Sequence, residues 1–197
     1  MSLLVKICGL REKRHVADAV EAGAGALGFV FAESPRKVTP EIARSISDIV
    51  PSTVKRVAVM MHPANEEWQD LLQSFEPDVL QTDAEDFDDL EIPKSVERWP
   101  VFREGRSKPD TPGTYVYEGS KSGRGQTVDW SAAAELARFG RMVLAGGLSA
   151  KNVATAIQTV RPFGVDVSSA VESAPGQKDS RLIREFIVAA RAAERKL

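Results

Sequence analysis

The chain has 197 residues, of which 43% are hydrophobic and 27% are charged. This is enough apolar sequence for one sizeable core, so we expect a single domain over residues 1–197. A formal net charge of -2 excludes the overall basic field that binds nucleic acid, and a small molecule is the expected partner. One cysteine excludes a disulfide framework, and two isolated histidines, His15 and His62, do not suggest a metal site. Both histidines are interpreted as surface or helix-start residues.

The beginning of the sequence lacks the charged-then-apolar pattern of a signal peptide. No apolar run approaches the roughly 18 residues that a membrane-spanning helix needs. The sequence therefore predicts a cytoplasmic protein that has no membrane partner, and it makes no prediction about oligomeric state.

Short strand-like runs recur along the chain, each bounded by glycine, proline or polar residues. They are rich in the β-branched, aliphatic and aromatic residues that favour strands. Eight such runs are expected, at residues 3–8, 26–31, 55–60, 78–81, 98–102, 114–117, 142–145 and 164–167.

Segments with helical periodicity lie between most of these runs. Trp68, Leu71, Leu72 and Phe75 fall on one face of a helix, and an apolar stripe over residues 182–190 predicts a final helix. Helix-start signals stand at Thr39-Pro40-Glu41, Asn65-Glu66-Glu67 and Ser149.

The alternation of strands and helices predicts an α/β fold, a (βα)8 TIM barrel. A closed parallel barrel fits better than an open sheet, because no Gly-x-Gly-x-x-Gly opening is present. Residues 103–113 are rich in charge, proline and glycine, so we expect the fifth helix to be reduced or missing. In such a barrel the chemistry lies at the carboxyl ends of the strands.

Cys8 lies at the end of the first expected strand, where Val5-Lys6-Ile7 meets Gly9. A thiol at the barrel mouth can act as a nucleophile or a base. The alternative is that Cys8 is a small buried hydrophobic residue, which is common for lone cysteines.

Two further strand ends carry charged side chains. Arg36, in Ser34-Pro35-Arg36 after the second strand, could form a bidentate pair with a substrate carboxylate or could be a solvated surface charge. Asp129 follows the sixth strand beside Val128 and Trp130, and it could be a functional carboxylate at the barrel mouth or only a helix cap.

The last two strand ends have features of a phosphate site. Gly146 and Gly147 precede Ser149, and Ser168 and Ser169 end the eighth strand. Backbone N–H groups and hydroxyls at adjacent strand ends can hold a phosphate. A Gly-Gly pair alone is more often only a turn.

Taken together, these residues resemble the phosphoribosylanthranilate isomerase family of tryptophan biosynthesis, from Lys6 to the last helix. The motifs are Lys6-Ile7-Cys8-Gly9, Ser34-Pro35-Arg36, Val128-Asp129-Trp130, Leu144-Ala145-Gly146-Gly147-Leu148, Gly164-Val165-Asp166-Val167-Ser168-Ser169, Pro175-Gly176 and Lys178-Asp179. The resemblance implies an intramolecular Amadori rearrangement of N-(5-phosphoribosyl)anthranilate with no metal or organic cofactor.

The resemblance also implies roles for individual residues. Asp129 would be the general acid at the furanose ring oxygen, and the Cys8 thiolate would take the proton from sugar C2. Burial against the apolar Val128 and Trp130 would help to keep Asp129 protonated. Arg36 would bind the anthranilate carboxylate, Asp166 would lie beside the anthranilate end, and Gln81 would also bind the substrate. The phosphate would be held by Gly146, Gly147, Ser168 and Ser169.

The chain departs from the family pattern at three places. Gln81-Thr82-Asp83-Ala84 has a carboxylate where the family usually has the histidine of Gln-Leu-His-Gly, and the loop before Asp129 reads Ser122-Gly123-Arg124-Gly125 where Gly-Gly-Thr-Gly is usual. Ala170 replaces the glycine expected after the two serines. Asp83 would repel an anionic substrate unless a cation such as Arg124 pairs with it.

Three alternatives stay open. The first is a related aminoaldose isomerase of histidine biosynthesis with a shifted substrate, although it would have aspartate at the position of Cys8. The second is a catalytically weak or silent barrel that binds a sugar phosphate. The third is a phosphosugar epimerase or aldolase barrel, which would need metal ligands or a Schiff-base lysine at a strand end, but Lys6 would lie one layer below the mouth.

Overall fold

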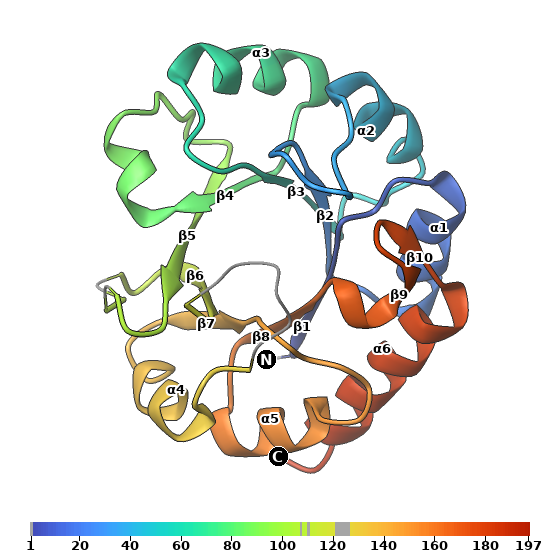
Figure 1. The fold of residues 1–197 in the computed structure, drawn as a ribbon, viewed down its shortest axis with the longest axis vertical. Helices are drawn as coiled ribbons and strands as arrows, with labels where there is room; N and C mark the ends of the chain where they lie inside the picture. The colour runs from blue at the N-terminus through green and yellow to red at the C-terminus, as the bar shows by residue number, and fades with distance from the viewer. Residues whose placement is uncertain (1, 107, 110, 121–126) are drawn as a thin grey trace.

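The computed structural model describes residues 2–106, 108–109, 111–120 and 127–197. Eight parallel strands close into a barrel in the order β1 to β8, with the first strand paired to the last (Figure 1). The barrel predicted from the sequence is therefore confirmed. The strands are β1 (Leu4–Cys8), β2 (Ala26–Val30), β3 (Lys55–Val59), β4 (Val79–Asp83), β5 (Glu97–Arg103), β6 (Thr114–Glu118), β7 (Arg141–Leu144) and β8 (Gly164–Val167).

Helices cover the outside of the barrel. They are α1 (Lys13–Ala22), α2 (Pro40–Ile46), α3 (Asn65–Phe75), α4 (Trp130–Leu136), α5 (Val153–Val160) and α6 (Ser180–Glu194), with short 3-10 turns η1 (Ala84–Asp88) and η2 (Ser169–Val171). The described residues between β5 and β6 form no helix, which confirms the expectation of a reduced or missing fifth helix. After β4 the acidic run of η1 takes the place of a longer helix, because its like charges repel along a helix. None of the described helices is long and apolar enough to span a membrane.

Two helices begin where the sequence indicated and a third begins later. The helix α3 starts at the predicted Asn65. Thr39 caps α2, because its hydroxyl accepts the N–H of Ile42, and Pro40 occupies the first turn. The helix predicted to start at Ser149 instead begins at Val153. Asn152 explains the difference, since its Oδ1 accepts the N–H of Ser149 at 2.8 Å and so fixes a turn ahead of the helix.

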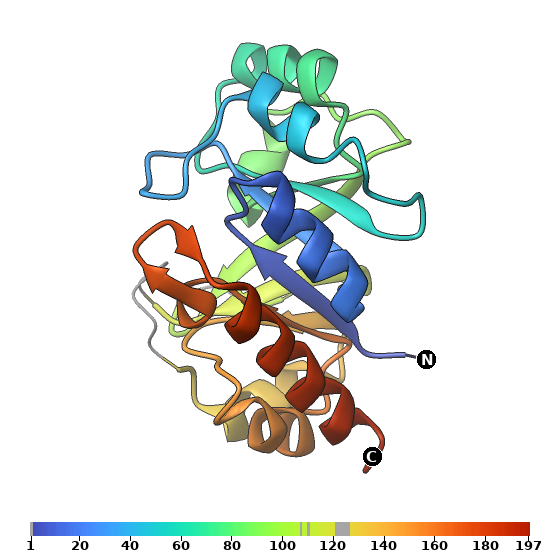
Figure 2. The same cartoon turned by 90° about the vertical axis from the view of Figure 1, so that its right-hand side faces the viewer.

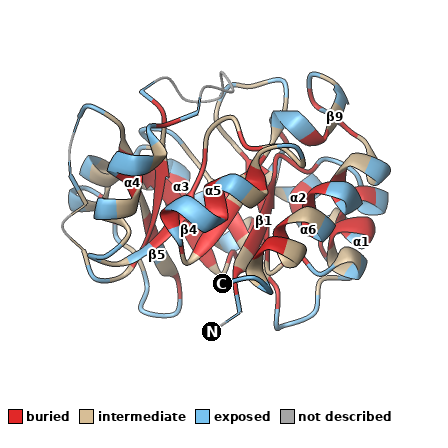
Figure 3. Ribbon diagram, turned by 90° about the horizontal axis from the view of Figure 1, so that it is seen from below, coloured by how far each residue is buried: buried red, intermediate tan, exposed pale blue. Residues whose placement is uncertain are grey.

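The core has two apolar layers. Trp68, Phe75 and Phe186 belong to the larger cluster, which fills the space between strands and helices. A smaller cluster fills the barrel, and its buried members are Ala26, Val57, Val79, Trp99, Val101, Val116, Val143 and Ala145. Figure 3 shows the buried residues concentrated along the strands and on the inner faces of the helices. The alternation of side chains along each strand supplies both layers.

A small hairpin lies between β8 and α6. It consists of β9 (Glu172–Ala174) and β10 (Gln177–Lys178), joined by a turn at Gly176, whose φ is +78°. Figure 2 shows this hairpin beside the loop that follows β2. The contact is close, because a Cβ on Gly176 would lie 2.3 Å from the carbonyl oxygen of Pro35.

This contact predicts a large cost for Gly176→Ala. Gly23→Ala is a matched control, because Gly23 also has a positive φ, of +97°, but a Cβ there would have no atom within 4 Å. The control should lower the free energy of unfolding by about 1 to 2 kcal/mol through backbone strain alone. Gly176→Ala should lower the free energy of unfolding by at least about 1 kcal/mol more than the control, because the Pro35 loop must also move. Equal losses of unfolding free energy for the two variants in urea denaturation would contradict this account.

Candidate active site

Cys8 lies at the carboxyl end of β1 with its side chain inside the barrel, only 7% exposed. It pairs with Gly28 of β2, where a Cβ would come within 2.8 Å of the thiol sulfur and 3.2 Å of Lys6 Nζ. The absence of a side chain at Gly28 therefore creates the space that the thiol and the ammonium group occupy.

Lys6 lies below Cys8 and is fully buried, as its position two residues earlier predicted. Its Nζ is 2.8 Å from Oδ1 of Asp166, the residue opposite it on β8. Burial lowers the pKa of Lys6, but the negative charges of Asp166 and a Cys8 thiolate outweigh it, so the pKa lies above its ordinary value. A charged, ion-paired lysine is unsuited to Schiff-base chemistry, which needs a neutral amine.

Burial and the neighbouring ammonium groups shift the pKa of Cys8 in opposite directions. Burial raises the pKa of Cys8, and Asp166 acts in the same direction. Lys6 and Lys178 lower it but do not compensate fully, so the pKa stays above that of a free thiol. This environment therefore favours the protonated thiol, while the two ammonium groups limit the cost of forming the thiolate.

Asp129 is the N-cap of α4, so the helix-cap interpretation is confirmed in geometry. Its Oδ1 accepts the N–H of Ser131 at 2.8 Å and that of Ala132 at 3.2 Å. Its own N–H donates to Oε1 of Glu104 at 2.7 Å. Val128 is buried, but Asp129 is exposed, so the burial expected from its apolar neighbours is not found.

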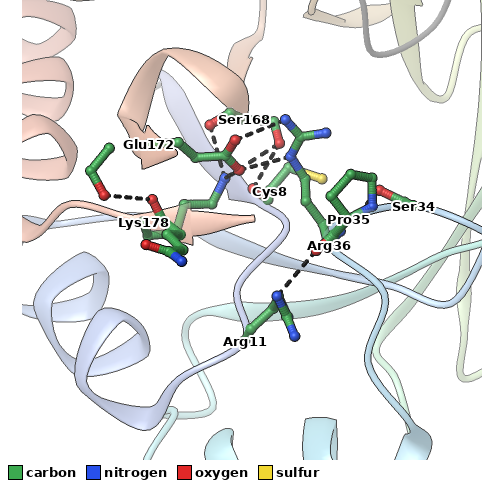
Figure 4. Close-up of polar contacts among 10 residues, drawn as sticks. Cys8, Arg11, Ser34, Pro35, Arg36, Ser168, Glu172 and Lys178 are labelled. Carbon is green, nitrogen blue, oxygen red and sulfur yellow. Dashed lines mark hydrogen bonds and ion pairs between the residues drawn. The ribbon is translucent and has the colours of Figure 1, made fainter. Parts of the chain in front are cut away.

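Arg36 is not a solvated surface charge. Its Nε donates to Oε1 of Glu172 at 2.7 Å and its Nη2 donates to Oε2 at 2.9 Å. Lys178 Nζ contacts the same Oε1 at 2.7 Å. Figure 4 shows the three side chains meeting near Cys8, and the stem of Arg36 occupies the space that a side chain at Gly9 would need.

Gln81 and Asp83 point into the barrel from β4 and both are buried. Oε1 of Gln81 has no hydrogen-bond partner among the described residues, which leaves an acceptor for a ligand. Asp83 is paired as expected, but its partner is Arg103 of β5, with Nη1 2.5 Å from Oδ1. The proposed partner Arg124 lies outside the described residues. Arg103 also contacts Glu118 of β6 at 3.1 Å.

The predicted phosphate residues gather at the ends of β7 and β8. Gly146 and Gly147 have φ values of +86° and +61°, a conformation that favours glycine. Asn152 fixes this loop by donating from Nδ2 to the carbonyl of Gly147 at 2.9 Å. Ser169 is exposed, but the hydroxyl of Ser168 donates to the carbonyl of Cys8 at 3.1 Å, so it braces the end of β1.

The structure places His15 in the first turn of α1, as the helix-start interpretation predicted, and reveals a contact of His62 that sequence reasoning missed. His15 is buried there and does not lie at the surface. His62 is 57% exposed in its side chain, and its Nδ1 lies 2.8 Å from Oδ1 of Asp86 while its Nε2 lies 3.4 Å from Oδ2 of Asp83. The hydrogen bond with Asp86 is the main cause that raises the pKa of His62. No local motif pointed to it, because its partners lie on the next strand and the turn that follows.

His62, Asp83 and Glu85 are a group that could hold a metal ion, since one ligand atom of each lies within 4.8 Å of the others. Asp83 is already neutralised by Arg103 at Oδ1, and Nε2 of His62 lies beside the other carboxylate oxygen, Oδ2. His62 and Asp83 are therefore already held by contacts with each other, with Asp86 and with Arg103.

Comparisons with known proteins point to one family. A family model for N-(5'-phosphoribosyl)anthranilate (PRA) isomerase matches residues 5–189. The N-(5'-phosphoribosyl)anthranilate isomerase of Listeria monocytogenes serotype 4b (strain CLIP80459) is 35% identical over 98% of this chain and 100% of the relative. That of Pelobacter propionicus is 38% identical over 93% of both chains.

Solved structures give the same result. Phosphoribosyl anthranilate isomerase from Thermotoga maritima has a TM-score of 0.85 at 31% identity, covering 97% of this chain and 100% of the other. The same enzyme type in complex with reduced 1-(o-carboxyphenylamino)-1-deoxyribulose 5-phosphate has a TM-score of 0.81 at 31% identity and the same coverage. The chain therefore belongs to the N-(5'-phosphoribosyl)anthranilate isomerase family.

Proposed function

We propose that the chain catalyses the isomerisation of N-(5-phosphoribosyl)anthranilate to 1-(2-carboxyphenylamino)-1-deoxyribulose 5-phosphate, a step of tryptophan biosynthesis, with Cys8 as general base and Asp129 as general acid. The observation that carries the assignment of the base is the thiol inside the barrel mouth, with Lys6 and Lys178 as cationic neighbours. Asp129 follows β6, so it lies at the same end of the barrel as Cys8.

The rearrangement needs two proton transfers. A proton from the Asp129 carboxyl to the furanose ring oxygen breaks the C1–O bond and leaves an iminium at C1. Removal of the C2 proton by the Cys8 thiolate then moves the electron pair into a C1–C2 double bond, and the resulting enolamine tautomerises to the ketone. The iminium adds a positive charge near Cys8 and so favours the thiolate at the moment when the base is needed.

The remaining residues would orient the substrate. Arg36 would bind the anthranilate carboxylate, with Asp166 beside the anthranilate end, and Gln81 would also contact the substrate. The loops at Gly146-Gly147 and Ser168-Ser169 would hold the phosphate. Because the Ser168 hydroxyl already donates to Cys8, any contribution of Ser168 to phosphate binding would come from its main chain.

We expect Cys8→Ser and Asp129→Asn each to lower kcat by at least about a hundredfold, the effect typical of losing a general base or acid. The assay is the loss of anthranilate-type fluorescence with freshly generated substrate. Asparagine caps helices about as well as aspartate, so Asp129→Asn should keep the melting temperature. Asp129→Ala should lose activity and about 1 kcal/mol of stability.

Two results would contradict this assignment. If Asp129→Asn stays active while Asp129→Ala is destabilised, Asp129 is only a cap. If the wild type binds a sugar phosphate but does not turn over, the chain is the catalytically silent barrel.

The thiol itself can be titrated, because Cys8 is the only cysteine. We expect the ultraviolet absorbance of the thiolate to appear above the ordinary thiol pKa of about 8.5, because burial raises the pKa. Lys178→Met should move the midpoint higher still, since Lys178 lowers the pKa of Cys8. Glu172 keeps Arg36 as a partner in this variant.

The same shift affects stability. The folded chain keeps a proton on Cys8 at pH values where the unfolded chain has lost it, so the free energy of unfolding should fall as pH rises above about 8.5. Cys8→Ser should remove this part of the pH dependence in denaturant titrations. A wild-type midpoint at or below the ordinary thiol pKa would contradict the account.

A further inference from the structure

Arg36, Glu172 and Lys178 form a buried cluster of three charges at the barrel mouth. Their side chains are 15%, 3% and 1% exposed, respectively. They come from the loop after β2, from β9 and from β10, so the cluster joins segments that are far apart in the sequence. Its central member is Glu172, which contacts both cations (Figure 4).

We propose that Glu172 is a positioning residue that orients the Arg36 guanidinium toward the carboxylate of the substrate. This rests on the proposed function, in which Arg36 binds that carboxylate. Glu172 itself contacts Arg36 and Lys178, and it acts on the substrate only through Arg36.

The bidentate contact leaves one defined edge of Arg36 available. A guanidinium has five N–H donors, and Glu172 accepts one from Nε and one from Nη2. The remaining donors are the second N–H of Nη2 and both of Nη1, which form a planar fork of the kind that matches a carboxylate. Holding this fork in one orientation reduces the conformational entropy lost on binding.

The charges of the cluster are matched to a single anion. Two cations and one carboxylate leave a net charge of one positive unit for the ligand. The hydrogen bonds from Arg36 and Lys178 outweigh the effect of burial and hold the pKa of Glu172 below its usual range. Glu172 therefore stays ionised near neutral pH.

The cluster also connects Arg36 to the strand end that carries the thiol. Lys178 Nζ donates to the carbonyl of Ser168 at 2.8 Å, and the Ser168 hydroxyl donates to the carbonyl of Cys8 at 3.1 Å. The N–H of Arg36 donates to Oγ of Ser34 at 3.1 Å, which fixes the base of the arginine. Glu172 thus sets where the carboxylate lies relative to the residue proposed to take the C2 proton.

Positioning and simple charge predict opposite results for Glu172→Gln. The variant raises the charge of the cluster from one to two positive units, so charge alone would tighten binding of an anion. If Glu172 positions Arg36, the guanidinium loses one charged anchor and is repelled by Lys178, so binding of the carboxylate weakens.

The experiment compares two probes in equilibrium binding: reduced 1-(o-carboxyphenylamino)-1-deoxyribulose 5-phosphate and its phenylamino analogue without the carboxyl group. We expect Glu172→Gln to lower the affinity for the carboxylated probe at least about tenfold. The affinity for the probe without the carboxyl group should stay within about twofold of the wild-type value. In turnover, KM should rise more than kcat falls. Glu33→Gln is the matched control, because Glu33 pairs with Lys37 on the same loop but is exposed. This variant should change the affinity for neither probe.

A second variant tests the same proposal at an unchanged net charge, in case Glu172→Gln alone does not fold. Glu172→Gln combined with Lys178→Met removes one charge of each sign, keeps the net charge of the cluster, and should also lose the preference for the carboxylated probe. Unchanged or tighter binding of that probe by folded Glu172→Gln, or a preserved preference in the double variant, would overturn the proposal. Equal loss of both probes would also overturn it. A wild type that binds neither probe would instead refute the proposed function.

Discussion

The ion pair between Lys6 and Asp166 is the interaction on which the site depends, because it joins the first and last strands where the barrel closes. Lys6 is fully buried, and removing one partner of such a pair leaves an uncompensated charge that costs about 3 to 5 kcal/mol. The ammonium group lies beneath Cys8, so the same contact that closes the barrel also places a positive charge beside the thiol. Closure of the fold and chemistry at its mouth are therefore linked through one side chain.

Above this pair, charged residues at the mouth are neutralised by neighbours on adjacent segments. Asp83 contacts Arg103, Arg103 contacts Glu118, and His62 contacts Asp83 from the loop after β3. The chain thus tolerates a carboxylate at position 83, since Arg103 pairs with it and His62 lies beside it. Such fixed ion pairs need little rearrangement when a charged ligand enters, which is the property that makes electrostatic stabilisation effective in a closed site.

The sequence predicted the elements better than the contacts between them. All eight strands were expected within two residues of their observed bounds, because each is an apolar run that ends at a turn residue. Cys8 and the glycine loop were found by their place at strand ends. The partner of Asp83 was not found, and neither were the contacts of His62 and Glu172, because these pairs depend on which side chains the closed barrel brings together. Asn152 displaced a helix start for a local reason that the serine signal did not reveal.

The segment from Pro175 to Asp179 holds the loops at the barrel mouth in place. Gly176 packs against Pro35, Lys178 donates to Ser168 and Glu172, and Asp179 caps α6 through the N–H groups of Arg181 and Leu182. This segment supports Arg36 through Glu172, whereas Cys8 lies on the barrel wall between Gly28 and Lys6. The two residues therefore have largely separate supports that meet at Ser168. A change in the hairpin should first disturb the binding of the carboxylate, because the thiol keeps its place in the wall.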